Sequence, residues 1–422
     1  MSTYTVVAAP PRQTKIPFNY ALEALRGVAA LLVVLSHGLT DGPKPDSTYV
    51  LTGFEQYQAP GHLGVIVFFF LSGYVIGLSN PTPITTAAAR KQYLHKRFVR
   101  LYPLYLVALL ITVLVAAWYH EYYSLGTLGA YLLFLQGLAV RAPFYNPPIW
   151  SLSYEVLYYL LFLLISARRW RPEWVASGCL LLALLASHLP LRFVVLASYA
   201  YGAVYWLLGL CLVRLRTAAQ PMHYGTALAL LLLLLSYSRL DLLHSVLQAL
   251  RLDIVEAQVP SFFDRAIVFS DLSYLVFCVP LLLVLTGRTV RGQHWLEWAA
   301  FAMPSLYLLA YIISGKIRQP ALFHTLFSSA CLYFLALGTY LWRDAAARYG
   351  ETIFQKLAPL GLISYGLYVT HYPFFFLFHR LPVFRGTAPF FLARLVLYFA
   401  LVLAIAWVLE RRLQPWFKRK LT

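Results

Sequence analysis

The sequence predicts an all-α fold, a polytopic transmembrane helical bundle, and three observations lead to this prediction. Of 422 residues, 60% are hydrophobic and only 12% are charged, which is about half the charged share of a typical soluble domain. Apolar runs long enough to cross a bilayer recur along the chain. Lysines and arginines gather between these runs, as they do in the cytoplasmic loops of membrane proteins. The chain is therefore expected to face lipid over most of its outer surface.

Each membrane span needs roughly 20 apolar residues to cross a core of about 30 Å as a helix. The candidate spans are residues 19–39, 61–79, 102–119, 149–167, 174–190, 196–213, 222–238, 267–287, 298–315, 321–342, 358–378 and 388–409. A further apolar segment, 124–140, is short and is expected to dip into the membrane without crossing it. Crossing there would put the basic residues 168–171 on the outside, against the usual excess of Lys and Arg on the cytoplasmic side. The predicted bundle has about 10–12 membrane-spanning helices, with both termini in the cytoplasm.

The predicted organisation is a cytoplasmic N-terminal tail at 1–18, a transmembrane domain at 19–412 and a basic cytoplasmic tail at 413–422. In a soluble protein the formal net charge of +18 would point to nucleic acid. Here the basic loops of a membrane protein explain the charge. Membrane lipid is therefore expected as a partner, and nucleic acid is not. The four cysteines lie in apolar runs without metal-ligand spacing, and no metal site is expected.

The first span carries three ionisable residues, Glu23, Arg26 and His37. Arg26 and His37 are eleven residues apart, which is about 16 Å and three turns along a helix, so both side chains lie on nearly the same face. With Arg26 near the cytoplasmic face, His37 is expected well into the membrane or near its outer half. Histidine is the usual group for removing a proton from a hydroxyl near neutral pH. A packing role, with the imidazole bonded to a neighbouring carbonyl, is an equal alternative.

A basic cluster follows the second span. Arg97 and Arg100 have the spacing i, i+3 and share a helix face, with Lys96 adjacent. Such a fork of guanidinium groups matches phosphate oxygens well. The alternative is a plain cluster of cytoplasmic positive charge.

The segment 145–159 reads YNPPIWSLSYEVLYY. Its two prolines predict a helix that starts near Ile149, and Ser151 is expected to cap that helix. Glu155 then enters an apolar, tyrosine-rich stretch, where a carboxylate needs a partner. The partner is a catalytic histidine, an acceptor hydroxyl or, in a purely structural pair, an arginine.

The segment LGLISYGLYVTHYP places Ser364, Tyr365 and His371 in one span. Pro373 is expected to interrupt this helix. A broken helix inside a membrane usually lines a cavity.

Taken together, these segments resemble the membrane acyltransferase-3 family, which includes bacterial O-antigen and exopolysaccharide O-acetyltransferases. The matching blocks occur in order as ALRGVAALLVVLSH, GVIVFFFLSGYVI, KRFVRLYPLY, PPIWSLSYEVLYYLLF, YWLLGLCLVRL, LGLISYGLYVTHYP and VLERRLQPWF. Two positions depart from the family pattern. Glu23 stands where an Asp is usual, and the terminal block reads ERRLQP where ERP is usual.

The resemblance implies acyl transfer from cytosolic acyl-CoA, with acetyl-CoA expected, to a hydroxyl of a glycan or lipid-linked saccharide. The family's Arg-x10-His signature falls on Arg26 and His37, and its RxxR element falls on Arg97 and Arg100. Its WSL-xx-E block falls on Trp150, Ser151 and Glu155, and its SY-x5-H block falls on Ser364, Tyr365 and His371.

These matches imply three groups of site residues. His37, Arg26 and Glu155 are the expected catalytic residues, with His37 acting as a base or carrying the acyl group. Arg97, Arg100 and Lys96 are expected to hold the phosphates of CoA. The residues expected to line the substrate route are Trp150, Ser151, Ser364, Tyr365 and His371.

The main alternative is a secondary transporter or flippase of a lipid-linked sugar or small molecule, because many spans and buried ionisable groups suit that class too. The RxxR pair favours the enzyme, since a transporter has no need of CoA. The acceptor stays open among a polysaccharide repeat, a lipid-linked intermediate, a macrolide and another small alcohol. Other glycan-assembly proteins are further candidate partners, and the bacterial inner membrane is the expected location.

Overall fold

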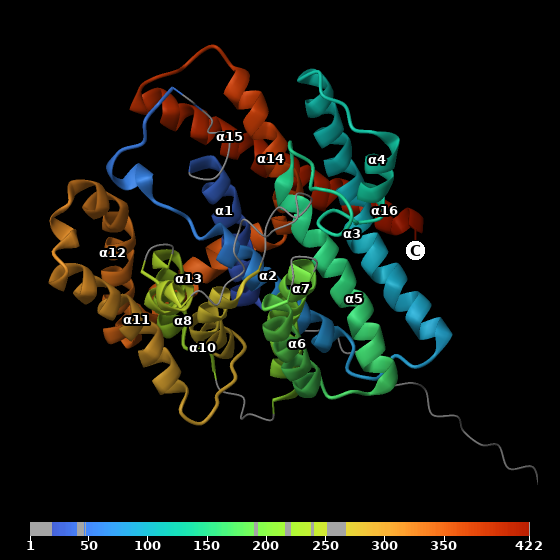
Figure 1. The fold of residues 1–422 in the computed structure, drawn as a ribbon, viewed down its shortest axis with the longest axis horizontal. Coiled ribbons are helices and arrows are strands. Elements are labelled where there is room, and N and C mark those ends of the chain that lie inside the picture. Colours follow the sequence, from blue (N-terminus) through green and yellow to red (C-terminus); the bar gives the residue numbers. More distant parts are fainter. Residues whose placement is uncertain are drawn as a thin grey trace, which may run out of the picture.

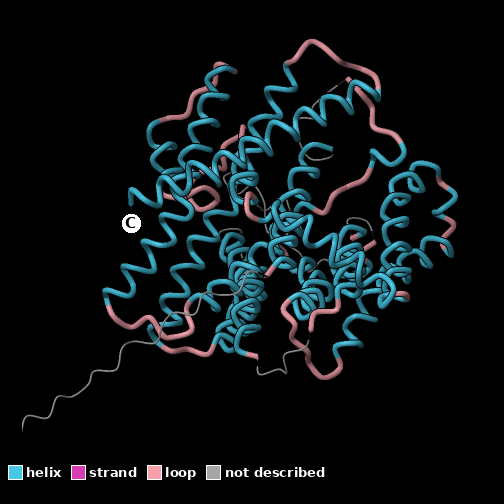
Figure 2. The backbone as a smooth tube through the Cα atoms, turned by 180° about the vertical axis from the view of Figure 1, so that it is seen from behind, coloured by secondary structure: helices cyan, strands magenta, loops and turns pink. Residues whose placement is uncertain are grey.

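The protein is helical throughout the part that the structure describes. The structure is a computed structural model, and it describes residues 19–39, 46, 48–189, 193–215, 221–237, 240–250 and 267–421. Within these ranges there is no β-strand (Figures 1 and 2). The expected N-terminal tail at 1–18 lies outside the described residues.

The α-helices are α1 (Tyr20–Leu39), α2 (Gly61–Ser79), α3 (Ala87–Trp118), α4 (Leu125–Leu132), α5 (Trp150–Arg168), α6 (Pro172–Ser187), α7 (Val194–Arg214), α8 (Tyr224–Ser236), α9 (Leu242–Ala249), α10 (Leu275–Leu285), α11 (Gln293–Ile313), α12 (Pro320–Leu341), α13 (Arg343–Gly361), α14 (Ser364–Arg380), α15 (Ala388–Val408) and α16 (Gln414–Leu421). Among the described residues, seven helical segments are long and apolar enough to cross a membrane, and four shorter apolar helices accompany them. The predicted fold class is confirmed.

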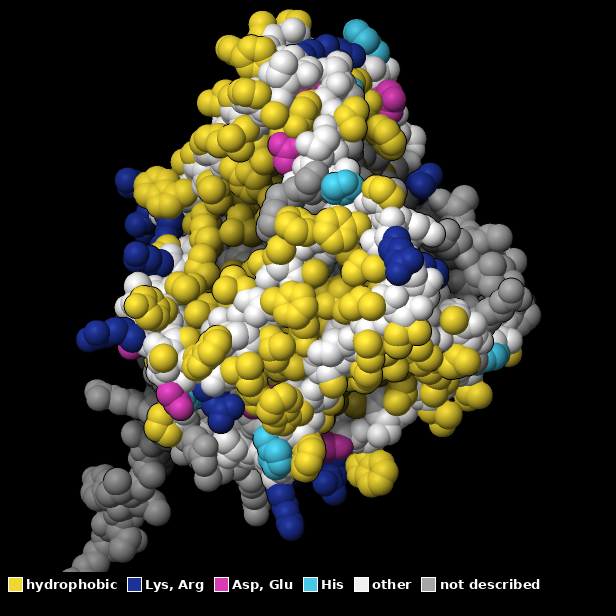
Figure 3. All heavy atoms as spheres, turned by 90° about the vertical axis from the view of Figure 1, so that its left-hand side faces the viewer, with side chains coloured by type: hydrophobic (Ala, Val, Ile, Leu, Met, Phe, Trp, Pro, Cys, Tyr) yellow, Lys and Arg dark blue, Asp and Glu magenta, His cyan; other side chains and the backbone are white. Residues whose placement is uncertain are grey.

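The outer surface is apolar, as a lipid-facing surface must be. Helices α1 and α2 run through the middle of the molecule, with α3 and α5 to one side and α11 and α12 to the other (Figure 1). The face over α11 and α12 is largely hydrophobic (Figure 3), and Ile313 and Phe334 are 76% and 61% exposed there. Soluble monomers rarely expose apolar patches of this extent.

Helix α4 occupies the segment that was expected to dip without crossing. At eight residues it is about 12 Å long, which is too short for a bilayer core of about 30 Å. The chain turns back after it, with a left-handed Phe134 at φ 57°. This geometry agrees with a re-entrant segment.

Helices α2 and α7 pack backbone against backbone through two glycines. A Cβ atom on Gly73 would lie 1.8 Å from the Trp206 carbonyl oxygen, and one on Gly209 would lie 2.0 Å from the Phe70 carbonyl oxygen. Small residues allow such close approach in membrane helices. The contact holds α2 in place.

The predicted span 358–378 is broken, but the break does not lie at Pro373. Helix α13 ends at Gly361, α14 begins at Ser364, and α14 runs through Pro373 to Arg380. Pro373 leaves the Val369 carbonyl without its helical N–H partner. Asn146 Nδ2 donates to that carbonyl at 2.9 Å instead, so the helix continues.

The predicted tail at 413–422 is part of a continuous helical segment, Ala388–Leu421. A π-helix, Leu409–Leu413, joins α15 to α16. Gln414 Nε2 donates to the Val99 carbonyl at 2.7 Å, which is the carbonyl that Pro103 leaves without a helical partner. The C-terminal helix therefore packs against α3.

The packing at Gly73 predicts a large effect of one methyl group. Gly73→Ala would push a Cβ into a backbone carbonyl that cannot rotate away, and overpacking of this kind costs about 1–3 kcal/mol. We expect a lower unfolding temperature of the detergent-purified protein. Gly178→Ala is the matched control, because a Cβ there meets nothing within 4 Å. Equal unfolding temperatures for the two variants would contradict the α2–α7 contact.

Candidate active site

Most of the predicted site residues surround one cavity, which we call the arginine cavity. Its volume is about 200 Å³. Its wall contains side chains from α1, α2, α3, α5 and α14, among them the predicted residues Arg26, Arg97, Arg100, Ser151, Glu155, Ser364 and Tyr365. Five helices that are far apart in the sequence thus bring these side chains together.

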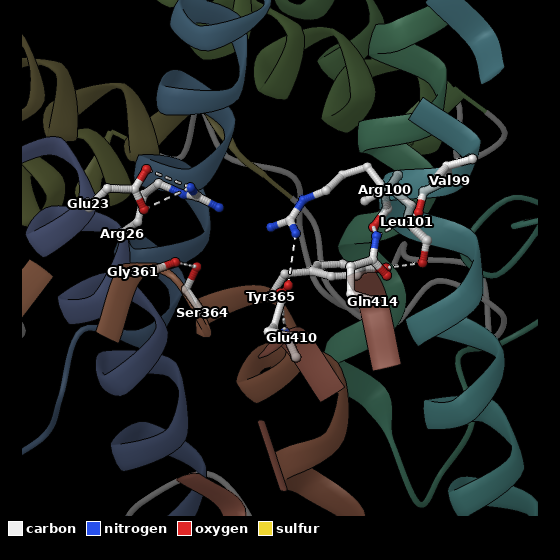
Figure 4. Close-up of polar contacts among 11 residues, drawn as sticks. Glu23, Arg26, Val99, Arg100, Leu101, Gly361, Ser364, Tyr365, Glu410 and Gln414 are labelled. Carbon is white, nitrogen blue, oxygen red and sulfur yellow. Dashed lines mark hydrogen bonds and ion pairs between the residues drawn. The ribbon is translucent and has the colours of Figure 1, made fainter. Parts of the chain in front are cut away.

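Two of the three arginines in this wall are held by carboxylates. Arg26 Nη1 lies 3.0 Å from Glu23 Oε1, one turn earlier on α1. Arg100 Nη1 lies 2.9 Å from Glu410 Oε2, which comes from the π-helix. Figure 4 shows the guanidinium groups of Arg26 and Arg100 directed toward the same space from opposite sides.

Glu410, which holds Arg100 without lining the cavity itself, is a carboxylate that sequence reasoning did not select. Besides Arg100, it accepts a hydrogen bond from the Gly366 N–H at 3.1 Å, so it ties the C-terminal helices to α3 and α14. Its signal was the ERRLQP block, which was noted only as a departure from the family pattern. A π-helix at this position is typical of a functional site.

Arg97 has no ion-pair partner among the described residues. Its guanidinium lies over the rings of Tyr93 and Tyr159, at 5.6 and 5.7 Å from their centroids. Its Nε is buried and has no hydrogen-bond partner in the described part of the chain. A buried donor without a partner is costly, so this arginine is suited to an anionic ligand.

Three further predicted residues of this wall, Glu155, Ser364 and Tyr365, each bond to a neighbouring residue. Glu155 accepts a short hydrogen bond from the Tyr159 hydroxyl. Ser364 donates to the Gly361 carbonyl at 2.8 Å, so it stabilises the break between α13 and α14. The Tyr365 hydroxyl donates to the Leu101 carbonyl at 2.9 Å, and Arg100 lies over the Tyr365 ring at 5.4 Å.

Lys96 does not belong to this wall. Its side chain is exposed, and it is not among the residues that line the cavity. Successive helix residues point about 100° apart, so a cavity that receives Arg97 leaves Lys96 turned away.

A second cavity of about 310 Å³ lies at the other end of α1, and we call it the histidine cavity. Its wall contains two predicted residues, His37 and Trp150. It also contains His62, which sequence reasoning did not select. The other lining residues include Ser36, Gly61, Arg141, Phe144, Pro148 and Tyr372.

A thin partition separates the two cavities. Val65 lines both of them. The Tyr368 hydroxyl, in the arginine-cavity wall, donates to the Pro148 carbonyl at 2.7 Å and lies 2.7 Å from Ser151 Oγ.

The predicted helix start near Ile149 is confirmed. Ser151 makes no capping hydrogen bond there and contacts Tyr368 instead.

His37 is backed by His371. His37 Nδ1 lies 3.1 Å from His371 Nε2, and the two rings stack with centroids 5.3 Å apart. His371 is fully buried, so it lies behind His37, not on the substrate route that was expected for it.

The hydrogen bonds determine the tautomer of both imidazoles. His371 Nδ1 faces two carbonyl oxygens, that of Tyr368 at 2.8 Å and that of Leu367 at 3.2 Å, so Nδ1 must carry the hydrogen. In neutral His371 the Nε2 atom then accepts, and His37 Nδ1 must donate to it. The lone pair of neutral His37 is therefore on Nε2, the nitrogen that a base needs.

The comparisons with known proteins identify the family of the chain. The family model described as an acyltransferase domain matches residues 19–312, which include α1 to α5 with Arg26, His37, Arg97, Arg100 and Glu155. The chain is also similar to Acyltransferase MdmB of Streptomyces mycarofaciens, with 30% identity over 200 residues. That match covers 43% of this chain and 49% of the relative, so the chain spans about half the length of the curated relative. No solved structure matches. On the family match, the chain belongs to the membrane acyltransferase-3 family, and its long apolar helices are those of an integral membrane protein.

Proposed function

We propose that this acyltransferase moves an acetyl group from cytosolic acetyl-CoA to a hydroxyl of a glycan-type acceptor, at the inner membrane of a bacterium. One observation carries the proposal. Helix α1 passes both cavities, with Arg26 in the wall of one and His37 in the wall of the other. An anion-binding cavity and a basic cavity on one helix suit the transfer of a group from a phosphorylated carrier to a hydroxyl.

The arginine cavity suits the anionic donor. Its wall has three guanidinium groups and one carboxylate, and phosphate oxygens would supply the partner that Arg97 Nε lacks. The nearby Arg90 and Lys91 on α3 favour a cytosolic position for this end. At about 200 Å³ the cavity is smaller than the ~300–1,000 Å³ pockets that hold a whole drug-sized ligand. It would therefore take the narrow pantetheine arm and leave the adenine outside.

His37 is the group that meets the reacting atoms. Its Nε2 takes the proton of the acceptor hydroxyl while the hydroxyl oxygen attacks the thioester carbonyl. The C–O bond forms, the C–S bond breaks, and the proton passes on to the departing CoA thiolate. In the covalent form of this reaction Nε2 first takes the acyl group itself. In either form His371 is a positioning residue, because it holds His37 in the required tautomer.

Arg26 and Glu155 act on the donor in this scheme. Arg26 is about 16 Å from His37 along α1, so it orients CoA instead of stabilising charge on a carbonyl beside His37. Glu155 lines the arginine cavity, and no histidine of the described chain lines that wall. The thioester end must pass the partition, so the hydrogen bonds of Tyr368 must break when the donor advances.

The histidine cavity suits a sugar-containing acceptor. Phe144, Trp150 and Tyr372 give its wall aromatic faces, and His37 gives it a base. Its volume of about 310 Å³ reaches the lower end of the ~300–1,000 Å³ range of ligand pockets. One saccharide unit of a larger glycan would fill it.

Arg97→Gln is expected to weaken acetyl-CoA binding. Losing one charge-assisted contact of about 1.5–3 kcal/mol raises the Kd by roughly 10- to 150-fold, measured with radiolabelled acetyl-CoA on protein in lipid nanodiscs. Lys96→Gln is the matched control, since it removes the neighbouring charge outside the cavity, and its Kd should stay within about twofold of the wild type. Equal Kd values for the two variants would refute the donor site.

His37→Ala is expected to abolish transfer without affecting donor binding. Removing a general base typically costs about 10²- to 10⁴-fold, measured as label passed from acetyl-CoA to acceptors in native membranes. His188→Ala, at an exposed histidine after α6, controls for the loss of an imidazole. Undiminished transfer by His37→Ala at normal expression would exclude this role for His37.

A further inference from the structure

The histidine cavity has a second imidazole that the scheme above does not use. His62 lies in the first turn of α2 and lines the cavity together with His37. Its Nε2 lies 3.0 Å from Asp271 Oδ2, a residue 209 positions away in the sequence. His62 is therefore a wall residue whose imidazole pairs with a carboxylate that does not itself line the cavity.

Asp271 is a fixed anchor for this imidazole. Its side chain is 3% exposed, and the Val268 N–H donates to the same Oδ2 atom at 2.9 Å. The Tyr205 hydroxyl donates to the Asp271 backbone carbonyl. The carboxylate therefore cannot turn away from His62 without also leaving the Val268 N–H unpaired.

This anchor determines which nitrogen of His62 faces a ligand. The carboxylate accepts only, so in neutral His62 the Nε2 atom carries the hydrogen and Nδ1 carries the lone pair. Among the described residues Nδ1 has no hydrogen-bond partner, whereas Nε2 has Asp271. The His62 side chain is 23% exposed, which leaves Nδ1 available to a hydroxyl donor in the cavity.

The contact between α1 and α2 brings the two imidazoles to one place. A Cβ on Gly61 would lie 2.3 Å from Ser36 Oγ, so the helices touch at these residues. His37 and His62 are the next residues along each chain, and both line the same cavity. An acceptor there meets one imidazole from each helix.

We propose that His62, held by Asp271, binds a second hydroxyl of the acceptor, next to the hydroxyl that His37 deprotonates. The acceptor is accordingly a polyhydroxyl compound with neighbouring hydroxyls, such as a sugar, and a simple alcohol is a poor substitute. This inference rests on the proposed function. A site built to bond a hydroxyl discriminates strongly against an analogue that lacks it, because the site's polar group is left unpaired.

Small probe acceptors test the second hydroxyl directly. Cyclohexanol has one hydroxyl, and the cis and trans forms of cyclohexane-1,2-diol each have a second hydroxyl on the neighbouring carbon. Each is offered with labelled acetyl-CoA to the full chain in nanodiscs, and kcat/KM for acetyl transfer is measured. We expect the wild type to prefer a diol by roughly 5- to 150-fold, the equivalent of one hydrogen bond of about 1–3 kcal/mol.

Two substitutions connect this preference to His62. His62→Phe keeps a ring but has no nitrogen, so the diol should fall to the level of cyclohexanol. The readout is the ratio of the two kcat/KM values, diol over cyclohexanol, within each variant, and the Kd for acetyl-CoA should be unchanged. His62→Gln, whose amide can both donate to Asp271 and accept from a hydroxyl, should restore part of the preference and guards against misfolding of His62→Phe.

Three results would overturn the inference. The first is a wild type that shows no preference for a diol over cyclohexanol. The second is a diol preference that survives in both variants. The third is a protein that acetylates membrane acceptors but transfers acetyl to neither probe. A purely structural pair would lower the unfolding temperature of both variants and leave the diol preference intact. Failure of the proposed function is a separate result, in which acetyl-CoA does not bind or no label reaches a membrane acceptor.

Discussion

The position of α1 is the constraint on which both cavities depend. The helix is held from two sides by contacts that only glycine allows. A Cβ on Gly361 would lie 2.0 Å from the Glu23 carbonyl oxygen, and one on Gly64 would lie 2.8 Å from the Ala29 carbonyl oxygen. Because α13 and α2 approach α1 this closely, Arg26 and His37 reach different cavities from one rigid rod. A shift of α1 by one turn, about 5.4 Å, would misplace both.

The electrostatics of the two cavities differ in a way that suits their proposed substrates. In the arginine cavity two guanidinium groups have carboxylate partners, and Arg97 keeps an unpartnered buried Nε in the described chain. In the histidine cavity His37 is backed by an imidazole and His62 by a carboxylate. The imidazole of His371 orients His37, whereas the carboxylate of Asp271 orients His62.

The sequence predicted the residues whose burial is costly and missed those that need a distant partner. Glu155 stood out because charge in an apolar span demands a reason, and Arg97 stood out because its i, i+3 spacing with Arg100 matches phosphate oxygens; both residues line one cavity. His62 did not stand out, because its role depends on a pairing with Asp271, which lies 209 residues away in the sequence. The helix break was expected at Pro373, but Asn146 satisfies the carbonyl that proline frees, and no local pattern reveals that contact.

The most direct measurement is a structure with acetonyl-CoA, a thioether analogue of acetyl-CoA that cannot be cleaved at its carbonyl. The account predicts CoA phosphates against Arg97, the hydrogen bond from Tyr368 to Pro148 broken, and the acetyl carbonyl carbon within about 3.5 Å of His37 Nε2, the distance of a reactive approach. A donor that sits wholly in the arginine cavity, with the partition closed and its carbonyl at Glu155, would contradict the account.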